Sequence, residues 1–264
     1  MADSPSASTS ETVGDPVSAV LVCGGRWHDF DFARLELLGL LAEHEDIRTT
    51  VCADFSESEA IARADFLVTY TCDLDPLSEA EQENLAAFVA GGGRWFALHG
   101  TNSVFEFVEQ GVRALRTHDT MMQALGSRFL AHPPIAPYRV ENVAPDHPLV
   151  AGVEPFETED ELYLCEYFGE IRPLLATTFV GEARGFVDRD WPQDDPRLVM
   201  YLHPEGRGEV LYLTLGHCRG PHDMRPRMER YPKVERGSWE LPVFHDLLRR
   251  GIRWAMGDPR MVAA

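Results

Sequence analysis

The sequence predicts a single doubly wound α/β domain, in which a mostly parallel sheet carries helices on both faces. Three observations favour this class: apolar strands alternate with amphipathic helices, the connections between them are short, and 44% of the 264 residues are hydrophobic, as in ordinary globular proteins. We place the domain at 17–258. The preceding 1–16 are rich in Ser, Thr, Asp and Glu and lack an apolar run, so we expect a disordered tail there.

The first half of the chain supplies the parallel part of the predicted sheet. A continuous apolar run predicts a buried strand at Val17–Cys23, and further strands are expected at Arg48–Ala53, Asp65–Thr71 and Arg94–Leu98. Helices are expected at Phe32–Glu43 and after Ser78, which forms a capping box with Glu81. In such a sheet ligands bind at the carboxyl ends of the strands, so the residues that follow each strand matter most.

The second half adds further strands. They are expected at Tyr138–Val143, Leu174–Phe179, Leu198–His203 and Glu209–Leu215, and an amphipathic helix closes the domain at Phe244–Ala255. Two long loops, 188–196 and 219–237, are candidates for a lid, with a solvated surface excursion as the alternative.

Charge and composition exclude several classes of partner. The net charge is −19, with 43 acidic against 24 basic residues, and such a field repels phosphate backbones and anionic lipid. No apolar run of about 18 residues and no signal peptide is present, so we expect a cytoplasmic protein that binds neither nucleic acid nor membrane. The five cysteines form no Cys-x-x-Cys pair and are expected to be reduced thiols.

Histidines follow several of the predicted strands. His28 comes after the first strand, His99 follows Arg94–Leu98, and His217 follows the last strand. An imidazole at such a position serves as a general acid or base, or as a metal ligand, whereas a lone histidine is more often structural. The topology should bring His99 and His217 to the same rim, and we therefore predict them as catalytic residues.

A carboxylate and further imidazoles complete the predicted site. Glu161 lies in an acidic run, but Leu162 and Leu164 beside it suggest a partly buried strand that points Glu161 inward as a third catalytic group. The predicted metal ligands are His28, His99, His132 and His217, and zinc is the candidate ion, since three nitrogens and a carboxylate suit a catalytic zinc site. The spacing of the histidines does not by itself specify a metal.

Substrate-binding residues are predicted near the same strand ends. They are His28, Trp27, Asn102, Trp191 and Trp239. The tryptophans are candidate stacking platforms for the apolar face of a sugar ring, with core packing as the alternative.

One motif points toward a different chemistry. His203-Pro-Glu205 resembles the His-x-Glu of class I glutamine amidotransferases, whose nucleophilic cysteine sits on a strand-to-helix turn. This chain has His99 on the corresponding turn and no cysteine there, so glutamine hydrolysis is not expected.

Several short segments, in order, resemble the trehalose-utilisation (ThuA-like) family. They are Gly-Gly-x-x-His28, Gly91–Gly100 around His99, Gly126-x-x-Phe-x-x-His132, Asp146-His-Pro, Asp160-Glu-Leu-Tyr163, Gly206–Tyr212, Leu215-Gly-His217 and Gly251-Ile-Arg-Trp254-Ala. The resemblance implies a flavodoxin-like sheet of the class I glutamine amidotransferase type. It also implies a role in the use of trehalose or related sugars, oxidised (keto-) sugars included.

The leading functional hypothesis is an enzyme, a hydrolase, isomerase or lyase, that acts on such a sugar through a histidine-rich, metal-dependent site. The alternative is a noncatalytic sugar-binding or regulatory module, which would bind a disaccharide without converting it. A third reading is an interaction domain without a pocket. The expected partner is a small-molecule sugar, and self-association into a homo-oligomer stays open.

Overall fold

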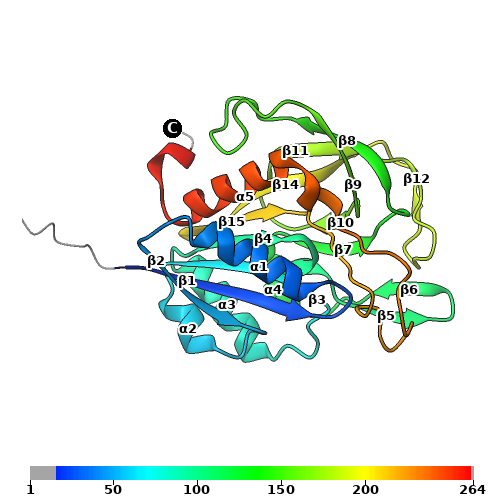
Figure 1. Cartoon of the computed structure of the whole chain (residues 1–264), viewed down its shortest axis with the longest axis horizontal. Helices are drawn as coiled ribbons and strands as arrows, with labels where there is room; N and C mark the ends of the chain where they lie inside the picture. Colours follow the sequence, from blue (N-terminus) through cyan, green and yellow to red (C-terminus); the bar gives the residue numbers. More distant parts are fainter. Residues whose placement is uncertain (1–15, 263–264) are drawn as a thin grey trace, which may run out of the picture.

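The computed structural model describes residues 16–262 (Figure 1). The predicted disordered tail therefore lies outside the described residues, apart from Pro16. A nine-stranded sheet forms the centre, in the order β2-β1-β3-β4-β15-β14-β11-β8-β9. Its strands are β1 (Val17–Gly25), β2 (Ile47–Cys52), β3 (Phe66–Cys72), β4 (Arg94–Leu98), β8 (Ala136–Asn142), β9 (Phe156–Asp160), β11 (Arg172–Thr178), β14 (Pro196–Glu205) and β15 (Gly208–Leu213).

The sheet is mixed. β2, β1, β3, β4 and β15 pair in parallel, whereas β14, β11, β8 and β9 extend the sheet through antiparallel pairs. The predicted α/β class with extra strands in the second half is confirmed, and the parallel part is confined to one half of the sheet. β14 ends at Glu205 and β15 begins at Gly208, and a turn this short permits only antiparallel pairing.

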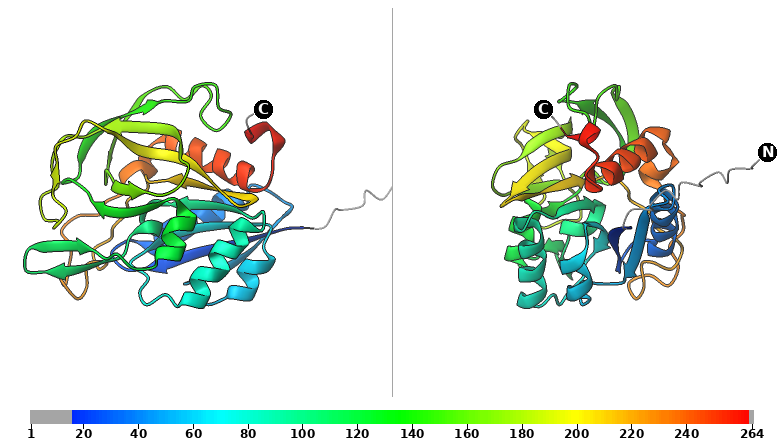
Figure 2. Two further views of the ribbon diagram at one scale, coloured as in Figure 1. Left: turned by 180° about the vertical axis from the view of Figure 1, so that it is seen from behind. Right: turned by 90° about the vertical axis from the view of Figure 1, so that its left-hand side faces the viewer.

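Helices cover both faces (Figure 2). α1 (Phe30–Leu41) and α5 (Pro242–Ala255) pack on one face, and α2 (Ser58–Arg63), α3 (Glu79–Ala90) and α4 (Asp119–Leu125) pack on the other. Neighbouring residues of β3 divide between the two layers, since Val68 packs with α1 and α5 while Leu67 packs with α2 and α3. A strand buried on both faces needs the unbroken apolar run seen in the sequence.

The capping box predicted for α3 is present. The Ser78 side chain accepts from the Glu81 amide, and the Glu81 carboxylate accepts from the Ser78 amide at 2.8 Å. The helix ends at Gly91, as the sequence indicated.

Short elements that the sequence did not predict gather at the carboxyl ends of the parallel strands. The hairpin β5 (Phe105–Val108) and β6 (Gly111–Ala114) lies beside the pair β7 (Ser127–Ala131) and β10 (Leu164–Tyr167), at the end toward which β1 and β3 point (Figure 1). A two-residue ladder joins β12 (Gly181–Glu182) to β13 (Asp190–Trp191), and β13 lies inside the predicted long loop 188–196. These pieces build walls around the strand ends.

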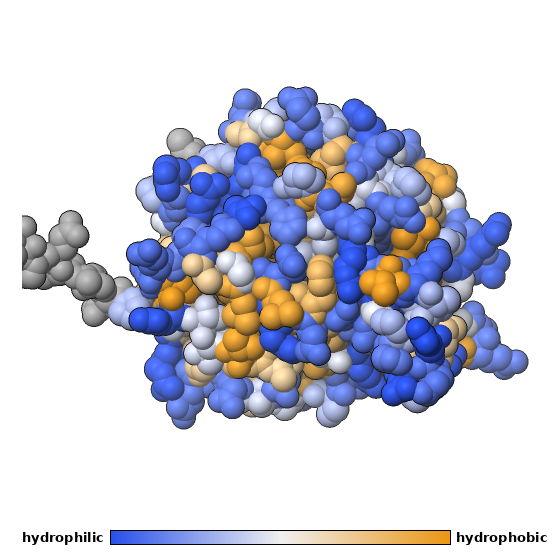
Figure 3. All heavy atoms as spheres, viewed as in Figure 1, coloured by the Kyte–Doolittle hydropathy of each residue, from blue (hydrophilic) through white to orange (hydrophobic). Residues whose placement is uncertain are grey.

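The surface mixes hydrophilic and apolar side chains. On the face that α1 and α5 cover, apolar side chains gather over α1 among hydrophilic ones (Figure 3). Leu35 of α1 is 71% exposed. Within 16–262, none of the helices combines the length and apolar character that crossing a bilayer requires.

Candidate functional site

Four buried side chains converge where the parallel strands end. His28 follows β1, His99 ends β4, His217 follows β15, and Glu161 lies between β9 and β10. One ligand atom of each lies within 4.8 Å of those of the other three. The rings of His99 and His217 have centroids 5.8 Å apart, so the predicted meeting of these two residues is confirmed.

A strained turn aims the imidazole of His99. His99 has φ +44° at the point where β4 becomes the short helical turn His99–Asn102 (η1). The next residue must be small, because a Cβ at Gly100 would lie 2.6 Å from the Thr71 carbonyl oxygen. A left-handed residue on a sharp strand-to-helix turn projects its side chain above the sheet.

The hydrogen bonds of His99 define its tautomer. Its Nδ1 lies 2.8 Å from the Thr214 carbonyl oxygen, which only accepts, so Nδ1 carries the hydrogen. In the neutral ring Nε2 then keeps its lone pair. That atom lies 2.9 Å from His28 Nε2 and 3.5 Å from Glu161 Oε2.

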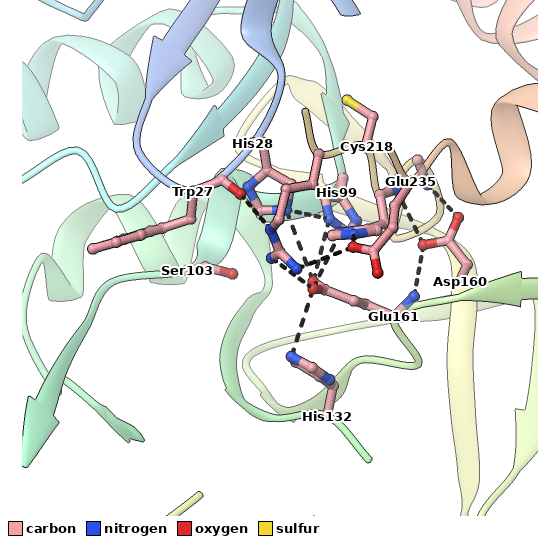
Figure 4. Close-up of polar contacts among 12 residues, drawn as sticks. Trp27, His28, His99, Ser103, His132, Asp160, Glu161, Cys218 and Glu235 are labelled. Carbon is pink, nitrogen blue, oxygen red and sulfur yellow. Dashed lines mark hydrogen bonds and ion pairs between the residues drawn. The ribbon is translucent and has the colours of Figure 1, made fainter. Parts of the chain in front are cut away.

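Glu161 is the centre of the cluster. Figure 4 shows His28, His99 and His132 turned toward its carboxylate. The strand expected around Tyr163 is wrong, because 161–163 form the irregular connection between β9 and β10. The inward direction of Glu161 is nevertheless observed, with 4% of the residue exposed.

Asp160, which the sequence reasoning missed, holds this connection in place. Its carboxylate accepts hydrogen bonds from the amides of Gly216, His217 and Ser238 at 2.9, 3.1 and 2.9 Å. It also accepts from the amide of Glu161 at 2.8 Å. One buried carboxylate therefore fixes the backbone of two site residues that are far apart in the sequence.

Burial and charge shift the pKa values in opposite directions across the cluster. Burial lowers the pKa of His28 to about 3, although Glu161 opposes this shift. Burial also disfavours charge on His217, but Glu161 and Glu235 outweigh it and raise the pKa of His217 to about 9. Burial raises the pKa of Glu161, yet the neighbouring His217 and His132 bring it well below its usual range. Glu161 is therefore a carboxylate at neutral pH.

The donor set fits a divalent metal ion. His217 Nε2 lies 2.9 Å from Glu235 Oε2, while its Nδ1, 3.1 Å from Glu161 Oε1, is buried without a hydrogen-bond partner within 16–262. A histidine held by a carboxylate through one nitrogen and free at the other is a common metal ligand arrangement. One nitrogen from each of His28, His99 and His217, with one carboxylate, matches the ligand types of catalytic zinc sites.

His132 lies outside this set of four. Its Nε2 is 3.6 Å from Glu161 Oε1, and its Nδ1 is 2.7 Å from the Pro133 carbonyl oxygen. Glu161 thus takes the position among the ligand atoms that the sequence reasoning assigned to His132. His132 lines a neighbouring cavity instead.

That cavity, of about 220 Å³, opens beside the cluster. His28, Glu161 and Trp27 border it, and so does Arg219 from the long loop 219–237. A cavity at the strand ends argues against the reading of an interaction domain without a pocket.

Arg219 and Glu235 are further site residues that sequence reasoning missed. Arg219 Nη2 lies 3.4 Å from Glu161 Oε1, and its Nη1 lies 3.2 Å from Glu235 Oε2. Their backbones also bond to each other at 2.9 and 2.8 Å, which closes the base of the loop. The length of this loop and its locally basic composition were the only signals in the sequence.

Three predicted substrate-binding residues lie away from the cavity. Asn102 is buried beneath it and donates to Ser127 Oγ at 2.6 Å. Trp239 packs in the core and donates to the Gly216 carbonyl oxygen at 2.7 Å. Trp191 lies in β13, and the Arg197 guanidinium stacks over its ring. The core-packing alternative therefore describes Trp239.

Neither His203 nor Cys72, which lies beside the cavity, is placed for the chemistry of a glutamine amidotransferase. His203 is a buried structural residue whose nitrogens face the carbonyl oxygens of Glu170 and Gln123 at 2.8 and 3.1 Å. Cys72 borders the cavity, but burial raises the pKa of its thiol well above the usual value. It is therefore a thiol and not a thiolate at neutral pH.

The fold and site define the class: an α/β protein of the glutamine amidotransferase type with a histidine on the turn above the central strand. A family model described as trehalose utilisation matches residues 19–225, and the chain belongs to this ThuA family. No curated protein matches the chain.

Solved structures agree on the fold. A protein from Bacteroides uniformis described as ThuA-like has 15% identity and a TM-score of 0.62, with 94% of this chain and 95% of that chain covered. A second, from Parabacteroides merdae, has 16% identity and a TM-score of 0.59, covering 92% and 90%. A protein from Thermoplasma acidophilum described as part of a GMP synthase has 8% identity and a TM-score of 0.51, covering 94% and 98%.

Proposed function

We propose that this chain is a metal-dependent enzyme of carbohydrate metabolism that acts on trehalose or a related sugar, oxidised (keto-) sugars included. The observation that supports this proposal most directly is a cluster of potential metal ligands beside a cavity, formed by His28, His99, Glu161 and His217. Membership of the trehalose-utilisation family supports the sugar, and the donor set supports the metal.

The four residues of the cluster would hold the ion. A bound divalent ion acts as a Lewis acid toward a carbonyl or hydroxyl oxygen. Residues around the cluster orient two of the proposed ligands. The Thr214 carbonyl oxygen orients His99, and the Glu235 carboxylate orients His217.

Two side chains on the cavity side are candidates for proton transfer and substrate orientation. With Nδ1 of His132 donating to the Pro133 carbonyl oxygen, its Nε2 keeps a lone pair near Glu161. Burial lowers the pKa of His132, so the ring is neutral at pH 7 and able to accept a proton. Arg219 brings a positive charge to the same cavity, and this charge would stabilise negative charge that develops on a sugar oxygen. A hydrolase, isomerase or lyase would use such a base and such a charge.

The experiment has two parts. Metal content is measured on the purified full chain after incubation with zinc and dialysis, for the natural protein and for His217→Gln, with the exposed His222→Gln as matched control. About one zinc per chain is expected in the natural protein and the control, and none in His217→Gln. Zinc retention by His217→Gln would contradict the proposed ligand set.

Turnover is then followed by NMR on trehalose and its keto derivatives, with and without zinc. Conversion that requires zinc and is lost in His217→Gln supports the enzyme. Binding without conversion of any of these sugars would overturn it and favour the noncatalytic sugar-binding module.

A further inference from the structure

Much of the cavity lining beside the cluster is built from aromatic rings. Phe107 and Phe105 come from β5, Trp27 follows β1, Phe129 lies in β7, and Phe186 lies in the segment before β13. The rings form a continuous series, with centroids 5.1 Å apart from Phe107 to Trp27, 6.2 Å from Trp27 to Phe105, 6.5 Å from Phe105 to Phe129 and 5.8 Å from Phe129 to Phe186. We call these five residues the ring wall.

Most polar atoms near the ring wall are engaged within the protein, and the Arg227 guanidinium lies 3.9 Å from the centroid of the Phe107 ring. The indole Nε1 of Trp27 donates to Asp73 Oδ2 at 2.7 Å, so this residue offers a ligand only its apolar faces. Arg219 donates through Nε to the Trp27 carbonyl oxygen at 3.0 Å, and its other nitrogens face Glu161 and Glu235. A ligand group on this wall therefore finds ring faces and few unused hydrogen-bond donors.

The cavity has an apolar side, the ring wall, and a polar side, the cluster, and these two sides favour a ligand with one apolar and one polar end. A fully hydroxylated ring could stack its apolar C–H face on one ring of the wall, but the hydroxyls around its rim would then face the other rings without partners, each at a cost of about 1–3 kcal/mol. An aromatic ring without hydroxyls only gains from leaving water. An apolar cavity of about 150 Å³ holds one benzene molecule. The present cavity, of about 220 Å³, has room for one such ring with polar atoms beyond it. Both rings of trehalose carry hydroxyls.

We propose that the ring wall is a binding site for an aromatic aglycone, and that the substrate class is an aryl glycoside. The aromatic group lies on the ring wall, and the sugar oxygens face Glu161 and His28 at the cluster. This inference rests on the proposed function, since it adds the second half of the substrate to the same site.

The test compares matched ligands by calorimetry on the zinc-loaded full chain. The probes are phenyl α-D-glucopyranoside, methyl α-D-glucopyranoside and trehalose. The phenyl glycoside should bind roughly tenfold or more tighter than the methyl glycoside, because only its aglycone buries an aromatic ring. Equal dissociation constants for the two glycosides, or tighter binding of trehalose, would overturn the proposal.

A pair of variants locates the effect. Phe107→Ala removes a half-buried ring of the wall, and Phe179→Ala removes a half-buried ring that does not line the cavity. Phe107→Ala should lose most of the preference for the phenyl glycoside and keep its zinc content, whereas Phe179→Ala should keep both. Preserved preference in a folded Phe107→Ala protein, verified by circular dichroism, would contradict the placement.

These experiments distinguish failure of the ring wall proposal from failure of the proposed metal-dependent enzyme. Zinc binding and zinc-dependent turnover without a phenyl preference would remove the ring wall proposal and leave the enzyme. A phenyl preference in the natural chain, lost in Phe107→Ala, without zinc binding would keep the ring wall and remove the metal-dependent enzyme.

Discussion

The carboxylate of Glu161 is the residue on which the cluster depends. It lies 3.1 Å from His217 Nδ1, 3.5 Å from His99 Nε2 and 3.4 Å from Arg219 Nη2. It is the one negative charge among the four proposed ligands.

Replacing this charge should weaken metal binding strongly. For Glu161→Gln we expect zinc affinity to fall roughly 100-fold or more, because a neutral amide is a poor zinc ligand. Loss of a residue that only orients a ligand lowers metal affinity by about 10–100-fold, and loss of a ligand itself should cost more. Calorimetric titration with zinc measures this. Glu159→Gln makes the same change at an exposed position two residues away and should bind as the natural chain does. Similar affinities in both variants would remove Glu161 from the ligand set.

The shifted pKa values of His217 and His28 should make the free energy of unfolding of the chelator-treated protein depend on pH. The pKa of His217 is raised to about 9, so its contribution to the free energy of unfolding is complete below pH 6.5 and is lost as pH rises to 9. The pKa of His28 is lowered to about 3, so its contribution grows as pH rises from 3 to 6.5. We expect the decline between pH 6.5 and 9 to be shallower in His217→Gln.

Urea unfolding at several pH values, with chelator present throughout, provides the measurement. His222→Gln, an exposed histidine, should retain the decline of the natural chain. An identical decline in His217→Gln would show that the charge of His217 does not govern it.

At the scale of elements, the turn from β4 into η1 sets the position of His99. The left-handed His99 and the close approach of Gly100 to β3 occur in consecutive residues. The turn thus tolerates no larger residue at its second position.

Substitution of this glycine should destabilise the chain. A Cβ at Gly100 would lie 2.6 Å from the Thr71 carbonyl oxygen and 2.7 Å from Cys72 Cβ, so Gly100→Ala should lower the free energy of unfolding by about 1–3 kcal/mol. Gly39→Ala in α1 has nothing within 4 Å and should raise it by about 0.5–1 kcal/mol. Denaturant unfolding of both variants checks the sign, and a stabilised Gly100→Ala would refute the tight turn.

At the scale of the whole molecule, the cluster joins segments that are distant along the chain. His28 and His217 come from opposite ends of the domain and meet through Glu161. An ion bound there would hold β1, β15 and the connection between β9 and β10 together.

Metal removal should therefore lower global stability. Zinc at 100 times its dissociation constant would add about 2.7 kcal/mol to the free energy of unfolding. The melting temperature should fall on chelation and recover on addition of zinc. Calorimetric melts of the natural chain and Glu161→Gln test this, because the variant should not respond to zinc. A natural chain indifferent to both chelator and zinc would contradict the metal site.

Local patterns predicted much of the fold and part of the site. The apolar runs of β1, β3 and β4 and the capping box of α3 are properties of neighbouring residues, and the sequence expresses them directly. His28, His99 and His217 were found because parallel strands end at one edge, a rule that needs only strand order. Asp160, Arg219 and Glu235 were missed because their roles depend on contacts with segments that are distant in the sequence or joined to them only by a long loop.

The sequence by itself determined the α/β class, the strand-end histidines and the absence of a cysteine above the central strand, because each depends on residue type and short-range periodicity. Only the tertiary structure decided that Glu161 gathers with His28, His99 and His217 while His132 lies beside them, that Trp239 belongs to the core and that five rings line one cavity. The physical reason is distance: burial, hydrogen-bond partners and pKa values depend on which remote segments pack together, and a linear pattern does not contain those contacts.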